Sequence, residues 1–144
     1  MIKVTGINHV AIAAPSQLAE MRRFYVDVLG IASVPRAIPK ELEETIPGFW
    51  LDFPVTHTQI HVLESEEQAP SREHKPIAIG PHTAYTVESV EDAARHLEAL
   101  GVPFQHGGPV IVVVDPGGNT VELREGGHAT PPMPAAAGNL GKLS

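Results

Sequence analysis

Apolar and polar positions along the first half of the chain predict one strand, one helix and then three shorter strands. Residues 5–13 alternate between two faces, as the residues of a half-buried strand do. After Ser16, which can cap a helix, apolar residues recur at intervals of three and four until Gly30, a typical C-terminal glycine. The polar segment 39–48 is predicted to be partly helical. The further strands are predicted at 33–38, 49–53 and 58–64.

The second half of the chain repeats this pattern. An alternating stretch begins near His82 and predicts a strand. Ser89 is placed to cap the next helix, with Asp92 positioned for a return contact, and the apolar stripe of this helix ends at Gly101. Further strands are predicted at 102–106, 109–115 and, after the turn D-P-G-G-N, 120–125.

The two halves match as a tandem repeat. The tripeptide L-G-I at 29–31 and L-G-V at 100–102 lie 71 residues apart, and His9 lies 73 residues before His82. The chain is therefore predicted to be an α+β protein made of two β-α-β-β-β modules. The predicted divisions are a first module at 1–64, a linker at 65–76, a second module at 77–126, and a flexible or docked tail at 127–144.

Composition narrows the classes of function. The 144 residues include no cysteine, which excludes disulfides, cysteine-ligated metal sites and thiol catalysis, so any metal must have nitrogen and oxygen ligands. The net charge of −7, with no cluster of lysine and arginine, argues against nucleic acid as a partner. No stretch resembles a signal peptide or a membrane span, so we expect a cytoplasmic protein with no membrane partner.

Four polar residues occupy equivalent positions in the two modules. Side chains of a strand alternate between faces, and the apolar set of the first and last strands should face the helix of each module. The opposite side, here called the helix-free face, then carries polar residues that could converge on a metal ion. Each residue alone could equally be a hydrogen-bonded or solvated side chain. The four are His9, His61, His82 and Glu122.

A competing metal motif, His57-x-x-x-His61, is rejected. In a helix these two histidines would share a face, but the Thr-, Ile- and Val-rich sequence favours a strand. Four residues of a strand span about 13 Å at ~3.3 Å per residue, which is too far for one metal ion. His57 is therefore predicted to lie in a loop or at the rim, and no chemistry is assigned to the remaining histidines, His74, His96, His106 and His128.

The chain resembles the vicinal oxygen chelate superfamily, which includes glyoxalase I, extradiol dioxygenases and bleomycin-resistance proteins. The resemblance covers residues 4 to about 126 and is most specific in N-H-V at 8–10, F-Y-x-x-x-L-G at 24–30 and D-P-x-G-N-x-x-E-L at 115–123. It implies a cupped mixed sheet around one divalent metal ion per site (Zn, Ni, Co, Mn or Fe). Carried over by position, the ligands are His9, His61, His82 and Glu122.

The resemblance also implies a homodimer that exchanges modules. In that arrangement, His9 and His61 of one chain meet His82 and Glu122 of a second chain. At position 61 the glyoxalase I pattern usually has glutamate and the epimerase pattern glutamine, so His61 departs from both.

These ligands suggest a lyase or isomerase that acts on a small oxygenated metabolite through a metal-stabilised enolate or enediolate. Glu122 could take a proton and Arg124 could meet a substrate anion. Alternatively, His9, His82 and Glu122 form a triad that suits an Fe(II) dioxygenase, and a metal-free, drug-sequestering protein is a further alternative. Phosphonate recognition of the fosfomycin type is not expected, because the first module offers mainly Arg36 and Lys40 as cations.

Overall fold

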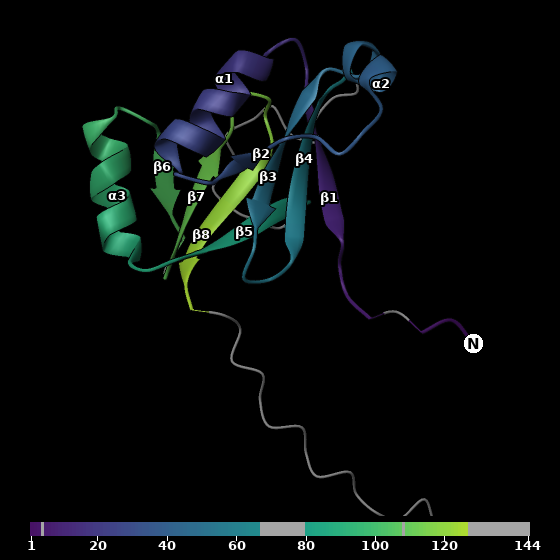
Figure 1. Cartoon of the computed structure of the whole chain (residues 1–144). Helices are drawn as coiled ribbons and strands as arrows, with labels where there is room; N and C mark the ends of the chain where they lie inside the picture. Colours follow the sequence, from purple (N-terminus) through teal and green to yellow (C-terminus); the bar gives the residue numbers. More distant parts are fainter. Residues whose placement is uncertain (4, 67–79, 108, 127–144) are drawn as a thin grey trace, which may run out of the picture.

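The strands of the protein form two four-stranded mixed sheets (Figure 1). The computed structural model describes residues 1–3, 5–66, 80–107 and 109–126. The first sheet has the order β1 (His9–Ala14), β4 (Thr58–Glu64), β3 (Gly48–Phe53) and β2 (Ser33–Val34). The second sheet has the order β5 (His82–Val87), β8 (Thr120–Glu125), β7 (Val110–Val114) and β6 (Phe104–His106).

Both sheets have the same pairing. The first strand of each module runs parallel to the last one, β1 to β4 and β5 to β8, and the remaining neighbours are antiparallel. A parallel pair needs a crossover connection, and the helical segments after β1 and β5 belong to these crossovers. The predicted repeat of β-α-β-β-β is therefore confirmed, apart from an added helix in the first module.

The helical segment of the first module consists of α1 (Leu18–Arg22) and η1 (Arg23–Val28), a wider π-helical turn. It begins after Gln17, so the predicted cap at Ser16 is wrong. A cap residue normally has an extended backbone, whereas Ser16 has a φ of 48° and its hydroxyl donates to Glu66 Oε1. The predicted end is confirmed, because Gly30 follows with a φ of 70°.

The stretch between the first helix and β3 is mostly irregular. The predicted strand at 33–38 is reduced to the two residues of β2, because Pro35 and Pro39 have no backbone N–H to donate to a sheet. The partly helical prediction for 39–48 is confirmed by α2 (Lys40–Thr45), none of whose residues is buried.

The helix of the second module, α3 (Val90–Ala99), has the predicted ends. The hydroxyl of Ser89 accepts a hydrogen bond from Asp92 N at 3.1 Å, and Gly101 follows the helix with a φ of 67°. The carboxylate of Asp92 binds Arg95, while the N–H of Val90 donates to Glu125 at the end of β8. Burial of Ala94 and Leu97 attaches α3 to its sheet.

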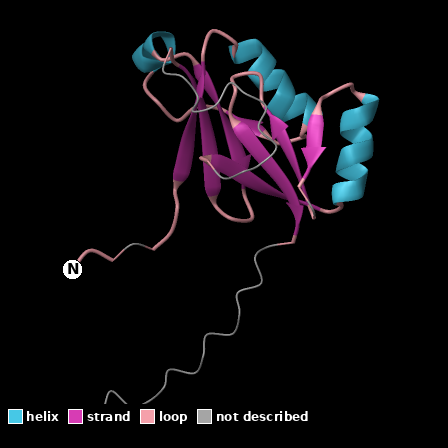
Figure 2. Cartoon of the chain, turned by 180° about the vertical axis from the view of Figure 1, so that it is seen from behind, coloured by secondary structure: helices cyan, strands magenta, loops and turns pink. Residues whose placement is uncertain are grey.

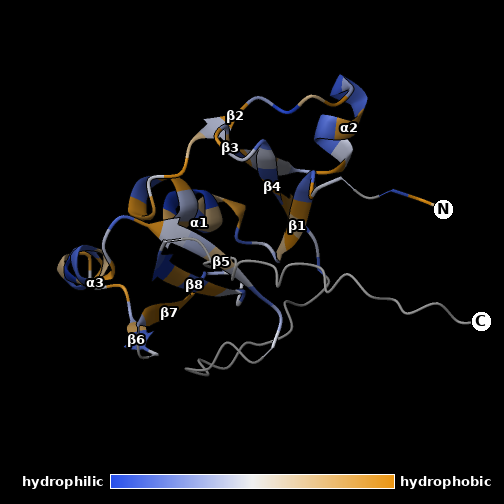
Figure 3. Cartoon of the chain, turned by 90° about the horizontal axis from the view of Figure 1, so that it is seen from below, coloured by the Kyte–Doolittle hydropathy of each residue, from blue (hydrophilic) through white to orange (hydrophobic). Residues whose placement is uncertain are grey.

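One hydrophobic core joins the two modules. It contains Met21 and Tyr25 of the first helical segment together with buried residues of β3, β4, β7 and β8. Viewed from below, the strands β1–β4 and β5–β8 lie on different sides of α1 (Figure 3). From behind, the helices lie along the top and one side of the strands (Figure 2). Within the described residues, no helix has both the length and the apolar character needed to span a lipid bilayer.

The predicted linker and tail fall largely outside this description. Only Ser65 and Glu66 of the predicted linker belong to the described residues, and the predicted tail at 127–144 lies outside them.

Candidate metal centre

The strand registers place the four predicted ligands at equivalent points of the two sheets. In the first sheet His61 lies opposite Ala11, two residues after His9. In the second sheet Glu122 lies opposite Ala84, two residues after His82. The relation of His9 to His61 is thus repeated by His82 and Glu122.

The first pair of residues forms part of a stack of three rings. The rings of His9 and His61 lie 4.1 Å apart at an interplanar angle of 13°, and the indole of Trp50 stacks on His61 at 4.0 Å and 4°. Trp50 reaches His61 because the two residues are direct partners in the pairing of β3 with β4. The ring of His61 is therefore held between two other rings.

Hydrogen bonds fix the orientation of both imidazoles. His9 Nδ1 lies 2.7 Å from Asn8 Oδ1, and His61 Nε2 lies 3.1 Å from Gln59 Oε1. Both partners are amide oxygens and can only accept, so the contacting ring nitrogens carry the protons. The second ring nitrogen of each histidine then has its lone pair available for a ligand.

The second pair lies on the helix-free face of the other sheet. His82 Nε2 is 3.6 Å from Glu122 Oε2, and His82 Nδ1 donates to the carbonyl of Gly80 at 2.9 Å. Glu122 is only 9 % exposed, although glutamate side chains are usually solvated. Arg124, two residues further along β8, donates from Nη1 to Glu122 Oε1 at 3.5 Å. The carboxylate is therefore flanked by an imidazole and a guanidinium.

A single chain keeps these two pairs separate. Among residues 1–3, 5–66, 80–107 and 109–126, no group of three or more His, Asp or Glu side chains is arranged to hold a metal ion. Each sheet instead contributes two potential ligands on its own helix-free face.

The surroundings of His61 favour its neutral form. Burial lowers the pKa of the His61 imidazole, and the nearby charges of His9 and Arg36 lower this pKa further. Only a neutral imidazole can coordinate a metal ion.

The other described histidines lie away from the two pairs. His57 is in the turn between β3 and β4 and has a φ of 53°, as expected for a loop residue. His96 on α3 contacts the carbonyl of Val28 at 3.0 Å, and His106 at the end of β6 packs edge-on against Phe104. His74 and His128 lie outside the described residues.

Sequence reasoning did not place Trp50 against His61. Alternation within 49–53 leaves open which parity faces the core, and the structure shows Phe49 and Leu51 buried, with Trp50 on the opposite face. The signal that could have placed Trp50 is the register between β3 and β4, which alternation within one strand does not reveal.

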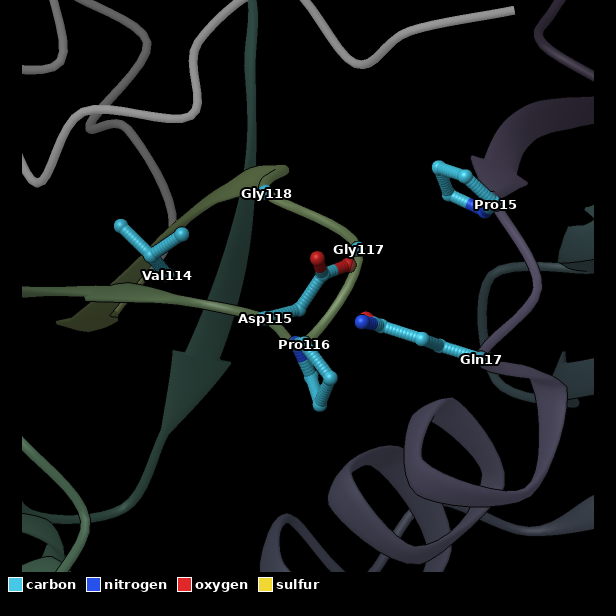
Figure 4. A pocket seen from close by; sticks show the side chains of 7 residues that line it. All are labelled: Pro15, Gln17, Val114, Asp115, Pro116, Gly117 and Gly118. Atoms are coloured by element: carbon cyan, nitrogen blue, oxygen red, sulfur yellow. The ribbon is translucent and has the colours of Figure 1, made fainter. Parts of the chain in front are cut away.

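A separate pocket of about 300 Å³ lies where the D-P-G-G-N turn meets the end of β1 (Figure 4). Its lining includes Pro15, Gln17 and Asp115, and none of the four predicted metal ligands. Asp115 is buried, which raises the pKa of its carboxyl, and it accepts hydrogen bonds from Tyr25 and Asn119. These internal partners satisfy Asp115, so we assign this pocket a structural role at the junction of the modules.

Comparisons with known proteins agree with this architecture. A protein described as a glyoxalase family member from Bacillus anthracis shares 26 % identity with the chain, covers 88 % of it over 99 % of its own length, and gives a TM-score of 0.68. A lactoylglutathione lyase from Agrobacterium tumefaciens is 22 % identical, covers 85 % of the chain over 95 % of its own length, and gives a TM-score of 0.60. A genomically encoded fosfomycin resistance protein from Listeria monocytogenes is 16 % identical, covers 88 % of the chain over 94 % of its own length, and gives a TM-score of 0.64.

At these low identities, the last two structures establish similarity of fold alone. No curated protein sequence gives a significant match to the chain.

The family comparison covers most of the chain. The model of the Glyoxalase/Bleomycin resistance protein/Dioxygenase superfamily matches residues 6–123, which include both sheets up to β8 and all four predicted ligands. The name of this superfamily covers enzymes as well as resistance proteins. The predicted resemblance and the glyoxalase-like α+β fold are thus confirmed, and the chain belongs to the Glyoxalase/Bleomycin resistance protein/Dioxygenase superfamily.

Proposed function

We propose that this protein is a divalent-metal-dependent enzyme of the vicinal oxygen chelate type that acts on a small oxygenated metabolite. Its metal site comprises His9, His61, His82 and Glu122. The observation that carries this proposal is that the two pairs have the same strand register. In each sheet, the histidine of the edge strand lies two residues before the residue that pairs with the second ligand. All four residues lie on the strand faces opposite those that supply the hydrophobic core.

The side chains present fit a divalent cation. The Nδ1–H groups of His9 and His82 donate to oxygen atoms, as metal-ligating histidines commonly do, and leave Nε2 unprotonated. Nitrogen and carboxylate ligands together suit Zn, Ni, Co, Mn or Fe. Three neutral imidazoles and one carboxylate would leave a divalent ion with a net positive charge.

The complete site would be shared between two copies of the chain. Each sheet offers one pair of ligands, and β1 and β5 are both edge strands that could approach a partner. Ile7, just before β1, and Val10, within it, are 70 % and 39 % exposed, so this edge presents apolar side chains that a partner could cover. A second copy whose β5 lies beside β1 would unite His9 and His61 with the partner's His82 and Glu122.

The chemistry of the proposed reaction is proton transfer next to a carbonyl group. A bound divalent cation would supply Lewis-acid polarisation of the substrate oxygens. Glu122, shielded from water and flanked by His82 and Arg124, is the candidate base, which would leave the metal to accept a proton from the substrate carbon. Arg124 would hold Glu122 in place between proton transfers.

A second candidate, an Fe(II) dioxygenase, is favoured by the packing of His61. Both ring faces of His61 are covered by His9 and Trp50, and its Nε2 is engaged by Gln59, which restricts how it can reach a metal ion. His9, His82 and Glu122 would then form a two-histidine, one-carboxylate triad. Dioxygen consumption with a catechol under Fe(II) loading would favour this candidate over the lyase or isomerase.

Metal binding tests the proposed site directly. Elemental analysis and calorimetric titration with Ni²⁺ or Zn²⁺, on protein without a polyhistidine tag, should show about one ion per site. Glu122→Ala and His82→Ala should weaken binding by roughly tenfold or more, because each removes a ligand. His57→Ala, which changes a turn histidine, is the matched control and should bind as the wild type does. A wild-type protein that binds no divalent metal would contradict the proposal.

A further inference from the structure

Arg36 has a buried donor without a protein partner. It follows β2 and is half-buried, and its Nε is inaccessible to solvent and has no hydrogen-bond partner within the described residues. An unpaired guanidinium N–H in such a place is unfavourable, since buried charged donors normally bind an acceptor. The arrangement therefore leaves a donor ready for an anion that the described residues do not supply.

The position of Arg36 connects it to the histidine stack. Val34 of β2 lies opposite Trp50, whose ring covers His61, and Arg36 comes two residues later. Asp52, on the same face of β3, accepts a hydrogen bond from Gln59 at 3.1 Å. An anion that completes Arg36 is therefore expected on the side of the sheet that carries Trp50 and His61.

We propose that Arg36 binds a carboxylate of the substrate, and that the site therefore takes a small 2-oxo or 2-hydroxy carboxylic acid. This inference rests on the proposed function, because the neighbouring oxygen of such an acid would lie toward the metal ligands. A guanidinium matches the two oxygens of a carboxylate in a fork of parallel hydrogen bonds. One such arginine suits a monoanion better than a doubly charged phosphonate, which usually needs several cations.

Arg124, in β8 of the second sheet, is less suitable than Arg36 as the anion site. Its Nη1 already donates to Glu122 at 3.5 Å, and moving it to a substrate would leave that carboxylate without this partner. The two arginines can be distinguished experimentally by replacing each one alone.

The test compares a charged and an uncharged probe of similar size. Pyruvate and hydroxyacetone both carry adjacent oxygens, but only pyruvate has a carboxylate. Their affinities are measured by calorimetry on Ni²⁺-loaded wild type, Arg36→Gln, Arg36→Lys and Arg124→Gln. Arg95→Gln is the matched control, because Arg95 is an exposed arginine bound to Glu91 and Asp92 on α3. Metal affinity and thermal stability are measured for each variant.

In the wild type, pyruvate should bind more tightly than hydroxyacetone. Arg36→Gln should weaken pyruvate binding roughly ten- to a hundredfold, as expected for loss of a charge-assisted pair, and leave hydroxyacetone affinity unchanged. Arg36→Lys should restore part of the loss, since it keeps the charge but not the fork. Arg95→Gln should match the wild type.

Two different failures can be separated. If metal binds normally but Arg36→Gln leaves pyruvate affinity unchanged, or if only Arg124→Gln weakens it, the role of Arg36 is overturned while the metal site stands. If no metal binds, the proposed function fails, and the same comparison on metal-free protein decides the carboxylate site. Loss of pyruvate binding in Arg36→Gln would then still support Arg36 as an anion-binding residue.

Discussion

At the scale of single residues, Trp50 determines how His61 can act. Its indole lies parallel to the imidazole at 4.0 Å and limits rotation of the ring toward β3. Because His9 covers the other face, only the edge of the imidazole remains available for a ligand. Trp50 is therefore a positioning residue for the proposed metal site.

Replacing Trp50 tests this positioning role. Trp50→Leu should weaken Ni²⁺ binding several-fold, since His61 would lose its fixed orientation, while Trp50→Phe should keep most of the affinity. Calorimetry provides the measurement, with thermal unfolding as a check on folding. Because Trp50 is the only tryptophan, its fluorescence should also change when metal binds to the wild type. Equal affinities in the leucine variant and the wild type would contradict the role.

Two buried tyrosines at the module junction are expected to behave differently. The hydroxyl of Tyr25 donates to Asp115 at 2.7 Å, whereas that of Tyr85 is buried without a hydrogen-bond partner in the described part of the chain. Tyr25→Phe should destabilise the fold by about 1–3 kcal/mol, because a buried carboxylate loses a donor. Tyr85→Phe, the matched change, should be neutral or stabilising. Denaturant titration measures both, and a reversed order would contradict this interpretation.

The same tyrosines predict a loss of stability at alkaline pH. Burial raises the pKa values of both hydroxyls, and the charge of Asp115 raises them further. Below the unfolded-state value of about 10 their contribution is complete. Above it, the unfolded state loses protons that the folded state retains, so the free energy of unfolding should fall by up to ~1.4 kcal/mol per pH unit for each tyrosine. Denaturant titrations at pH 9 and above 10 check the slope, which Tyr85→Phe should reduce.

At the scale of elements, β3 and β4 must approach closely to bring Trp50 and His61 together. Gly48 begins β3, and a Cβ at this position would overlap the backbone carbonyl of Val62 in β4. The absence of a side chain there allows the strand pair to form at its full length.

Gly48→Ala is therefore expected to destabilise the first sheet by about 1–3 kcal/mol, because backbone atoms cannot move aside as a side chain can. It should also reduce metal affinity by shifting Trp50 and His61. Gly6→Ala, where an added Cβ meets nothing within 4 Å, is the control. Thermal unfolding of the two variants provides the comparison, and equal melting temperatures would show that β3 tolerates the extra atom.

At the scale of the whole molecule, the packing of the modules keeps the two halves of the proposed site apart. The D-P-G-G-N turn is joined to the first helical segment by the bond of Tyr25 to Asp115. It is joined to β1 by Asn119 Nδ2, which donates to the carbonyl of Ala13 at 3.1 Å. These contacts fix one module against the other within the chain. A shared site between two chains follows if both pairs are ligands.

Mixing two inactive variants tests the shared site. His9→Ala and Glu122→Ala chains are each expected to lack intact sites, but a mixed dimer would contain one complete site built from the unaltered modules. About half of the mixed population should form such dimers at random pairing. Refolding the two together and measuring Ni²⁺ bound per chain gives the result, with each variant alone as the control. No recovered binding would favour sites within single chains.

Much of the fold could be predicted from the sequence because it depends on local patterns. Alternation of apolar and polar residues identified β1, β4, β5 and β8. The glycines that follow the two helical segments, both with a positive φ, marked where these segments end. The prediction of a cap at Ser16 was wrong because Ser16 has a positive φ and its hydroxyl binds Glu66, a residue far away in the sequence. The strand predicted at 33–38 is shorter than expected, because prolines have no backbone N–H for sheet pairing and this outweighs the strand preference of the apolar residues.

For the candidate site, the sequence by itself determined the residue types and the repeated parity of His9, His61, His82 and Glu122, because side chains of a strand alternate between faces whatever surrounds them. Only the tertiary structure decided that these residues form two pairs, that Trp50 covers His61, and that the Nε of Arg36 is buried without a hydrogen-bond partner among the described residues. Such facts depend on strand register and on how the modules pack. These are contacts between residues far apart in the chain, which local periodicity does not encode.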